Sequence, residues 1–315
     1  MQKSVNLRII IGTRGSALAM WQAKHVKSLL EETHENLSCE LQIIKTTGDK
    51  ITDAPLSRIG GKGLFTKEIE EALLRGEIDM AVHSMKDLPT ALPDGLTVGA
   101  VLERAHPGDA FVSKKYDSLA ALPEGTEVGT SSLRRRAQLL AYRPDLDVVD
   151  LRGNLDTRLR KVAEENPPAA ILAVAGIRRL GRENEITEII DTEIMLPAVA
   201  QGAIAVEIRE NDDAVRKILA PLHYEDTAAC CEAERAFLRE LEGGCQVPIG
   251  ARAVVTDGKL LLEGVIASLD GKQIVRDSFG GPVSDAKSIG TALAMRARKA
   301  GGDEILASVR RQLSD

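Results

Sequence analysis

One local design occurs twice in this 315-residue chain: a short apolar strand, a glycine turn, and a helix that begins at a hydroxyl residue. In the first instance, residues 7–11 (LRIII) lead into GTRGS at 12–16 and a helical pattern that runs from Ser16 to about Glu32. In the second, a strand at 126–130 leads into GTSSLRRRAQ at 129–138. Strands that alternate with capped helices build α/β layers, so the sequence predicts an α/β fold with largely parallel sheets.

The alternation of strands and helices continues along most of the chain and then changes character. Further strands are predicted at 41–47, 78–83, 110–113, 147–151 and 169–174, and further helices at about 66–76, 132–142 and 154–165. After a helix at 227–242, three strands at 247–255, 259–268 and 273–279 are joined by Asp-Gly hairpin signals, and a last helix spans about 284–313. We therefore expect two α/β lobes and a smaller α+β C-terminal domain.

Two segments have the composition of crossovers between the lobes. LERAHPGDA at 102–110 resembles a hinge, and the apolar run at 194–208 leads the chain back to the first lobe. We expect the first domain to comprise 1–102 and 203–220, the second 108–197, and the third 225–315.

Composition excludes several classes of protein. A net charge of −6 and 3% aromatic residues disfavour a nucleic-acid-binding protein. No apolar stretch approaches the roughly 18 residues of a membrane span, and the N-terminal apolar run is too short for a signal peptide. The four cysteines are Cys39, Cys230, Cys231 and Cys245. Their spacing matches no zinc site, so we expect no metal, free thiols and a cytoplasmic location.

Arginines gather where strands end and helices begin. Residues 130–160 contain seven arginines and four aspartates, although the chain as a whole is acidic. Helix N-termini expose unpaired N–H groups that attract anions, and a guanidinium adds a bidentate contact to a carboxylate or phosphate. This placement favours an anion-binding cleft; a solvated surface is the alternative.

The arginine run at the second helix start cannot share one face. Successive helical residues point about 100° apart. We expect Arg134 and Arg135 to lean toward the cleft and Arg136 to be solvated or structural. Arg14 and Ser16 at the first helix start could bind an anion in the same way, or Arg14 could simply lie at the surface of a turn.

Two further segments carry candidate groups. In HSMKDLPT at 83–90, Ser84, Lys86 and Asp87 follow the end of a predicted strand, where α/β proteins place ligands. Asp87 could act as a general acid or stabilise a cation; a solvated Lys-Asp pair is the alternative. IGGKG at 59–63 is no phosphate-binding P-loop and is interpreted as a mobile flap with Arg58 and Lys62, or as a plain connection.

Cys245 lies in LEGGCQVPIGA at 241–251, directly after a Gly-Gly pair that ends a helix. A loop cysteine that faces a basic cleft has a lowered pKa and is reactive. The alternative is a small buried residue, the usual fate of a free cysteine.

Together the motifs resemble those of the porphobilinogen deaminase (hydroxymethylbilane synthase) family. The matching segments are GTRGSALAMWQA, IGGKGLFTKEIE, HSMKDLPT, GTSSLRRRAQ, LRGNLDTRL, PAVAQGA and LEGGCQVPIGA, which span residues 12–251 in the family's order. The resemblance implies two lobes like those of periplasmic binding proteins and a third domain that carries a cofactor cysteine. It implies an enzyme of haem and chlorophyll biosynthesis, monomeric, that joins four porphobilinogen molecules with loss of ammonia to give hydroxymethylbilane.

The resemblance also implies a role for each matching residue. Cys245 would hold a dipyrromethane cofactor through a thioether, and Asp87 would be the catalytic residue, contacting pyrrole N–H groups and stabilising their developing positive charge. The cofactor would also be bound by Ser84, Lys86, Asp87, Thr130, Ser132, Arg134, Arg135 and Arg158. The substrate would be bound by Arg14, Ser16, Arg58, Lys62, Arg152 and Arg179. These cations and hydroxyls suit a substrate and a growing chain rich in carboxylates.

Two positions depart from the family pattern. Ala200 replaces the usual glycine of PAVGQGA, which we expect to stiffen the crossover, while Arg58 replaces a common lysine with retention of charge.

Two other functions compete with the transferase. A non-enzymatic anion-binding protein of the periplasmic type would also use two lobes, but it would not need the Cys245 loop. Nucleic-acid binding through 130–160 is disfavoured by net charge and few aromatics.

The intact mass of the purified protein tests the role of Cys245. We expect the wild-type chain to carry the extra mass of two linked pyrroles and the Cys245→Ala variant to lack it, because the thioether needs the thiol. Equal occupancy of such an adduct in both proteins would contradict the assignment.

Overall fold

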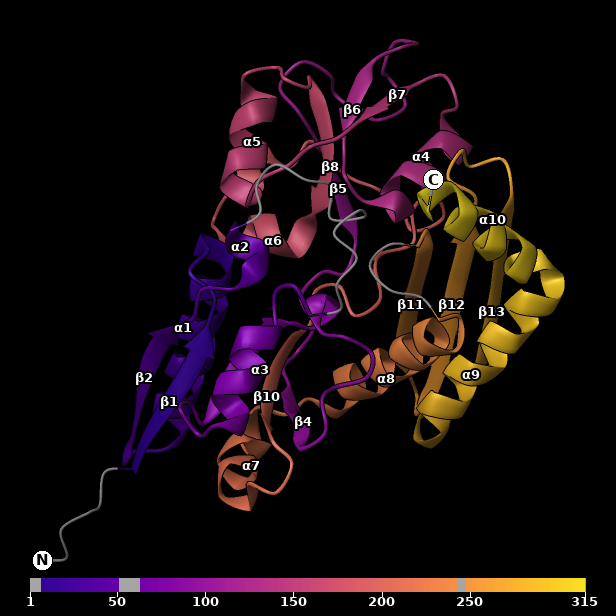
Figure 1. Ribbon diagram of the computed structural model, residues 1–315. Coiled ribbons are helices and arrows are strands. Elements are labelled where there is room, and N and C mark those ends of the chain that lie inside the picture. Colours follow the sequence, from indigo (N-terminus) through magenta and orange to yellow (C-terminus); the bar gives the residue numbers. More distant parts are fainter. Residues whose placement is uncertain (1–6, 51–62, 243–246, 315) are drawn as a thin grey trace, which may run out of the picture. The chain divides into compact units, whose positions relative to one another are not determined.

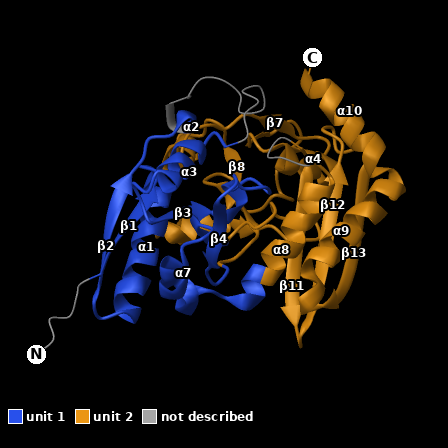
Figure 2. Cartoon of the chain, turned by 60° about the horizontal axis from the view of Figure 1, so that its bottom comes forward, with its two compact units in different colours: residues 1–53, 61–104, 203–228 blue, residues 54–60, 105–202, 229–315 orange. Residues whose placement is uncertain are grey.

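The computed structural model describes residues 7–50, 63–242 and 247–314 (Figure 1). The chain forms two compact units, coloured separately in Figure 2. Unit 1 comprises 1–53, 61–104 and 203–228, and unit 2 comprises 54–60, 105–202 and 229–315. The chain thus leaves unit 1 after Arg104, returns after Gly202 and leaves again after Ala228.

Unit 1 is built on a five-stranded sheet of order β2-β1-β3-β10-β4. Its strands are β1 (Leu7–Thr13), β2 (Leu37–Ile43), β3 (Met80–Ser84), β4 (Leu96–Val101) and β10 (Ile204–Arg209). Its helices are α1 (Ala17–Thr33), α2 (Thr47–Lys50), α3 (Lys67–Leu74) and α7 (Asp213–Leu219). Apolar residues of α1 and α7 share one core cluster with the sheet, and those of α3 share a second one with Ile78, Ala81 and Leu96. Helices therefore cover both faces of the sheet.

Unit 2 repeats this arrangement with the order β7-β6-β8-β5-β9. Its strands are β5 (Asp109–Ser113), β6 (Glu127–Gly129), β7 (Asp147–Val149), β8 (Ala169–Ala173) and β9 (Glu188–Ile189), and its helices are α4 (Leu133–Tyr142), α5 (Leu155–Ala163) and α6 (Val174–Arg179). In each sheet the first three strands are parallel and the other two pairings are antiparallel. Because β10 and β5 each run against both of their neighbours, the other four strands of each sheet point the same way, so the expectation of largely parallel sheets is confirmed apart from one reversed strand per sheet. The fourth strand of each order, β10 or β5, enters directly from the other unit and therefore runs against its neighbours.

A second, antiparallel sheet in unit 2 confirms the change of character after residue 225. It has the order β11-β12-β13, with β11 (Ile249–Thr256), β12 (Lys259–Ala267) and β13 (Ile274–Pro282). The accompanying helices are α8 (Glu225–Glu240), α9 (Ala286–Ala297) and α10 (Asp303–Ser314). The single long helix expected at 284–313 was wrong, because Gly301 adopts a left-handed φ of 105° that breaks it into α9 and α10.

The second strand of unit 1 also differs from its prediction. It spans Leu37–Ile43 instead of 41–47, since Leu37 and Cys39 alternate toward the core while Ile43 is 55% exposed. The pattern of apolar residues thus identified the strand. The predicted strand lies too far along the chain, because the prediction centres it on the isoleucine pair at 43–44.

The return crossover near residue 200 is held by a buried carboxylate. Glu234 is fully buried, and its two carboxylate oxygens accept the backbone N–H groups of Ala200 (2.6 Å) and Ala253 (2.7 Å). Ala200 adopts a left-handed φ of 59°, which costs a residue with a Cβ about 1 kcal/mol. Gly202 is left-handed too, and a Cβ there would lie 2.5 Å from the carbonyl oxygen of Ala105.

Substitutions at these two positions should have opposite effects on stability. Ala200→Gly relieves the left-handed conformation and should raise the free energy of unfolding by about 1 kcal/mol. Gly202→Ala adds both strain and a clash with backbone and should lower it by about 2 kcal/mol or more. Urea unfolding of both variants measures these differences; destabilisation by Ala200→Gly would contradict the account.

Candidate functional site

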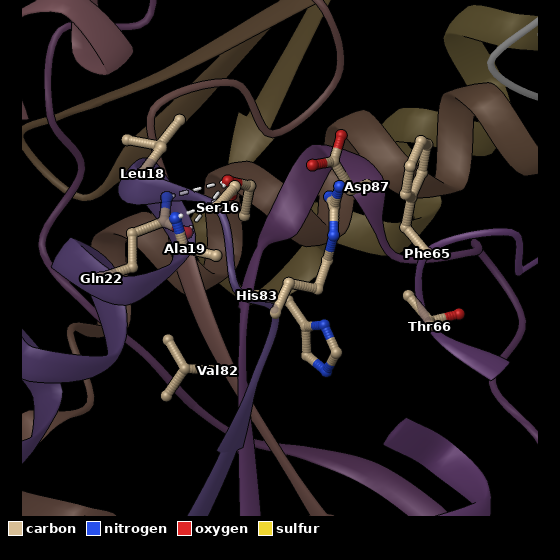
Figure 3. A pocket seen from close by; sticks show the side chains of 11 residues that line it. Ser16, Leu18, Ala19, Gln22, Phe65, Thr66, Val82, His83 and Asp87 are labelled. Atoms are coloured by element: carbon tan, nitrogen blue, oxygen red, sulfur yellow. Dashed lines mark hydrogen bonds between the residues drawn. The ribbon is translucent and has the colours of Figure 1, made fainter. Parts of the chain in front are cut away.

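A pocket of about 60 Å³ lies in unit 1 where β1 and β3 end and α1 begins (Figure 3). Strand ends and a helix N-terminus are where the sequence predicted an anion site. The lining residues are Arg14, Ser16, Leu18, Ala19, Gln22, Phe65, Thr66, Val82, His83, Ser84 and Asp87. Four of them, Arg14, Ser16, Ser84 and Asp87, were predicted site residues, so the fold brings these four together.

The α1 side of the pocket carries Arg14 and Ser16. Ser16 is the N-cap of α1, where its hydroxyl accepts the N–H of Ala19 at 3.3 Å. The guanidinium carbon of Arg14 lies 4.1 Å from the centre of the Phe65 ring, a cation–π contact. Stacking holds the guanidinium over the ring. A planar guanidinium matches the geometry of a carboxylate, to which it can donate two parallel hydrogen bonds.

The opposite side of the pocket comes from the end of β3. Ser84 is the last residue of the strand, and its hydroxyl lies 2.8 Å from the side-chain amide nitrogen of Gln22 on α1. A 3₁₀ turn, Met85–Asp87, follows and carries Lys86 and Asp87. Asp87 is exposed and is the only carboxylate among the lining residues. A carboxylate therefore lies in the same pocket as the guanidinium of Arg14.

The second predicted anion site lies in unit 2, at the start of α4. Ser132 caps α4 by accepting the N–H of Arg135 at 3.4 Å, and the Thr130 hydroxyl accepts the N–H of Ser132 at 3.2 Å. Both hydroxyls thus order the helix start itself. Arg136 is exposed and donates to the carbonyl oxygen of Val148, in line with the expectation that it is solvated or structural.

Arg134 and Arg135 are buried against Asp109, the first residue of β5. Arg134 donates to one oxygen of Asp109 at 2.7 Å, and Arg135 donates twice to the other, at 2.7 and 3.1 Å. Asp109 is 0% exposed, Arg134 5% and Arg135 6%. The sequence predicts that both arginines lean toward the cleft; among the described residues, each has the internal carboxylate of Asp109 as a partner.

Burial and ion pairing act in opposite directions on Asp109. Burial alone would raise the pKa of this carboxyl, but the guanidiniums of Arg134 and Arg135 outweigh burial and hold the pKa well below its ordinary value. Asp109 is therefore a permanent anion at neutral pH. Arg134 retains one buried donor, Nε, without a hydrogen-bond partner.

The other predicted arginines of unit 2 have different surroundings. Arg152 follows β7 and lies 3.6 Å from Asp150, and Arg158 on α5 donates to the carbonyl oxygen of Gly153 at 2.8 Å. Arg179 ends α6 and donates to the carbonyl oxygen of Gly202 at 2.6 Å, and burial lowers its pKa to about 10. Arg179 thus contacts the return crossover.

Three predicted site residues, Cys245, Arg58 and Lys62, lie outside the described residues. Within the described ranges, no cluster of His, Cys, Asp and Glu is arranged to hold a metal ion. In the same ranges, no helix is both long and apolar enough to cross a membrane.

Sequence reasoning missed several residues that the fold brings to these sites. Phe65, Gln22, Thr66 and His83 line the pocket, and Asp109 pairs with the two arginines. Asp109 had a signal, since it is an acidic residue where the hinge segment 102–110 enters a buried strand. Gln22 lies on the same helix face as Leu18, but its partner Ser84 is distant in sequence, so nothing local marked it.

Comparisons with known proteins give one consistent result. A family model described as "Porphobilinogen deaminase, dipyromethane cofactor binding domain" matches residues 9–217, and one described as "Porphobilinogen deaminase, C-terminal domain" matches 228–299. The porphobilinogen deaminase of Pelotomaculum thermopropionicum is 54% identical over 304 residues, covering 96% of this chain and 97% of the relative. That of Geobacter sulfurreducens is 52% identical over 302 residues, covering 96% and 95%.

Solved structures of methionine-binding proteins show a weaker likeness. The methionine binding protein MetQ is 16% identical, with a TM-score of 0.44 over 70% of this chain and 92% of that one. A putative methionine-binding lipoprotein from Bacillus subtilis is 15% identical, with a TM-score of 0.41 over 70% and 92%.

Replacement of Asp109 tests the buried cluster. Asp109→Asn keeps the shape but leaves two buried guanidiniums without an anion, so the free energy of unfolding at neutral pH should fall by about 3–5 kcal/mol. Because the folded-state pKa of Asp109 is lowered, its contribution is present above its ordinary pKa and is lost as pH falls below that value. Urea titrations should therefore show the two proteins converging in acid. Asp145→Asn, which breaks the partly exposed pair with Arg143, is the control and should cost about 1 kcal/mol or less.

Proposed function

Because this chain belongs to the porphobilinogen deaminase family, we propose that the pocket of unit 1 binds porphobilinogen and that Asp87 is its catalytic carboxylate. The chain is an enzyme of tetrapyrrole biosynthesis, EC 2.5.1.61, with a dipyrromethane cofactor binding domain. It joins four porphobilinogen molecules head to tail, releases ammonia at each step and yields hydroxymethylbilane. When bound, a dipyrromethane cofactor would supply the pyrrole carbon to which the first substrate is joined.

The observation that carries the proposal is that Asp87 and Arg14 both line the same pocket. Porphobilinogen offers two carboxylates and a pyrrole N–H, so it needs both a cation and an anion from the protein. Arg14, held over Phe65, matches a carboxylate, and the hydroxyls of Ser16 and Ser84 add hydrogen bonds. Asp87 matches the pyrrole N–H and stabilises the positive charge that develops on the ring as ammonia leaves.

The donors at the start of α4 fit a cofactor that carries several carboxylates. Arg134 and Arg135 bring two guanidiniums to a single internal carboxylate, so the described cluster keeps an excess of positive charge. Arg134 also has a buried Nε donor without a partner. We assign Thr130, Ser132, Arg134, Arg135 and Arg158, together with Ser84 and Lys86 of unit 1, to the cofactor, and Arg152 and Arg179 to the substrate.

Several parts of the proposal rest on sequence alone. Cys245 is the attachment point of the cofactor, through a thioether, and Arg58 and Lys62 contact the substrate from the flap. We further propose a cytoplasmic monomer with three domains, in which the antiparallel sheet of unit 2 and its helices form the third. What supports these points is the order of the matching motifs and the separate C-terminal family model.

Replacement of Asp87 tests the proposed function. Asp87→Asn keeps the size of the side chain and removes the charge, so porphobilinogen turnover should fall by about 100-fold or more. The covalent cofactor mass and the melting temperature should stay as in wild type, because Asp87 is exposed and ends a surface turn. Asp94→Asn, at an exposed acidic position of the same unit outside the pocket lining, is the control. Near-normal turnover of Asp87→Asn would overturn the assigned role.

A further inference from the structure

A buried polar cluster lies beneath the pocket, on the face of the unit 1 sheet that α3 covers. In the antiparallel pairing of β3 and β10, Ala205 lies opposite His83 and Glu207 lies opposite Ala81. His83 and Glu207 are therefore diagonal neighbours on one sheet face, within reach of each other. The Nε2 of His83 lies 3.0 Å from a carboxylate oxygen of Glu207, and the two residues are 5% and 0% exposed.

The start of α3 adds two more polar side chains to this face. Thr66 is the N-cap residue of α3 but its hydroxyl makes no capping hydrogen bond, and Glu70 lies one turn later. They are 1% and 6% exposed. Glu207 from β10 and His83 from β3 act electrostatically on Glu70, and the Thr66 hydroxyl lies close to its carboxyl group. Thr66 and His83 also line the pocket, as Figure 3 shows, so the cluster borders the site.

Three oxygen atoms of the cluster have no hydrogen-bond partner within the protein. They are Oγ1 of Thr66, Oε1 of Glu70 and Oε1 of Glu207, and each is buried. A buried polar atom left without a partner costs about 1–3 kcal/mol. Three such atoms on neighbouring side chains are expected to be satisfied by a shared ligand. A water molecule has the required chemistry, since it donates two hydrogen bonds and accepts others.

The carboxylates also require a proton. Two ionised carboxylates side by side in the interior would repel each other, and one imidazole can neutralise only one of them. Burial, first, and the Glu207 carboxylate as well raise the pKa of Glu70, while Thr66 and His83 lower it. A proton held on the Glu70 carboxyl group removes this repulsion.

We propose that Thr66, Glu70, His83 and Glu207 bind one water molecule and one exchangeable proton, and thereby act as positioning residues for the turn that carries Asp87. A short stretch of backbone connects the cluster to Asp87, because His83 and Ser84 end β3 and Met85–Asp87 is the turn that follows. Loss of the proton places two anions beneath this strand end and displaces the turn. The effect on turnover rests on the proposed role of Asp87, whereas the water and proton do not.

The matched variants Glu70→Gln and Glu71→Gln test the proposal. Glu70→Gln removes the ionisable group with little change of shape, and Glu71, the next residue on α3, has a half-exposed side chain paired with Arg75, so it serves as the control. Infrared spectra of the full-length holoenzyme, recorded between about pH 4 and pH 9, should show a buried carboxylic-acid band that persists above the ordinary pKa of glutamate. The band should vanish in Glu70→Gln and remain in Glu71→Gln. Retention of the same band in Glu70→Gln would overturn the proton assignment.

Stability supplies a second readout that does not depend on catalysis. Because the folded-state pKa of Glu70 is raised, wild-type stability is undiminished below the ordinary pKa of glutamate and falls as pH rises through the folded-state value. Glu70→Gln should match wild type in acid and become progressively more stable than wild type as pH rises from the ordinary pKa of glutamate to the folded-state value. Identical pH dependence in the two proteins would contradict the buried proton.

Turnover tests the positioning role separately. The kcat of Glu70→Gln near pH 6 should stay within about twofold of wild type, and its alkaline decline should move up by about half a pH unit or more, because glutamine cannot ionise. Thr66→Val is the second variant: it removes the hydroxyl group that lowers the pKa of Glu70 and should move the infrared midpoint upward. An unchanged alkaline limb in Glu70→Gln, with the infrared change present, would refute the positioning role alone.

Discussion

The buried contact between Asp109 and two arginines is the interaction on which unit 2 depends. Asp109 is the first residue of β5, just after the chain enters unit 2, and Arg134 and Arg135 lie in the first turn of α4. Gln201, in the segment that leads the chain out again, donates to the same carboxylate at 2.9 Å. One anion thus connects the entry strand, the exit segment and the helix start that carries the predicted cofactor ligands. Each of these charges would be prohibitively costly in the interior without the others.

The same physical theme recurs at the exit segment. The buried carboxylate of Glu234 accepts two backbone N–H groups, from Ala200 and from β11, and so fixes a residue that a left-handed conformation would otherwise disfavour. The side chain of Arg179 reaches the carbonyl oxygen of Gly202, two residues further on. Buried charged groups that bind backbone atoms therefore specify the path of the chain where the local sequence alone would not. This explains how alanine is accommodated at position 200.

The sequence predicted the elements of this fold well where strands and helices are short, apolar and bounded by glycine. The strand, glycine and capped-helix design located β1 and α1, and later β6 and α4, to within a few residues, because capping and burial are local effects. Strand direction could not be predicted in the same way. The antiparallel placement of β5 and β10 follows from where the chain crosses between units, which depends on contacts between residues far apart in sequence, such as Asp109 with Ala173 and Ile204 with Ser84.

Prediction of the site shows the same division. Ser16 and Ser132 were identifiable as helix caps, and Asp87 as a carboxylate at a strand end. Asp109 as the partner of Arg134 and Arg135 was not identifiable, since only the folded sheet brings β5 beneath the start of α4. The cluster of Glu70, His83 and Glu207 likewise needs the register of β3 with β10 and the docking of α3. Side chains whose role depends on local structure, such as helix caps, can be predicted from sequence patterns. Side chains whose role depends on a partner distant in sequence can be identified only from the tertiary structure.

The charge balance at the start of α4 bears on how a carboxylate is bound there. Two guanidiniums share one carboxylate, and removal of Asp109 would leave two buried cations unpaired. An incoming carboxylate that displaced Asp109 would also break the hydrogen bond from Gln201. A carboxylate that joined the cluster would instead give it two cations and two anions. The buried Nε of Arg134, which has no hydrogen-bond partner, is a donor to which such a carboxylate could bind. Addition to the cluster preserves the interior contacts that exchange would destroy, so we expect Asp109 to stay bound to both arginines when the cofactor is present.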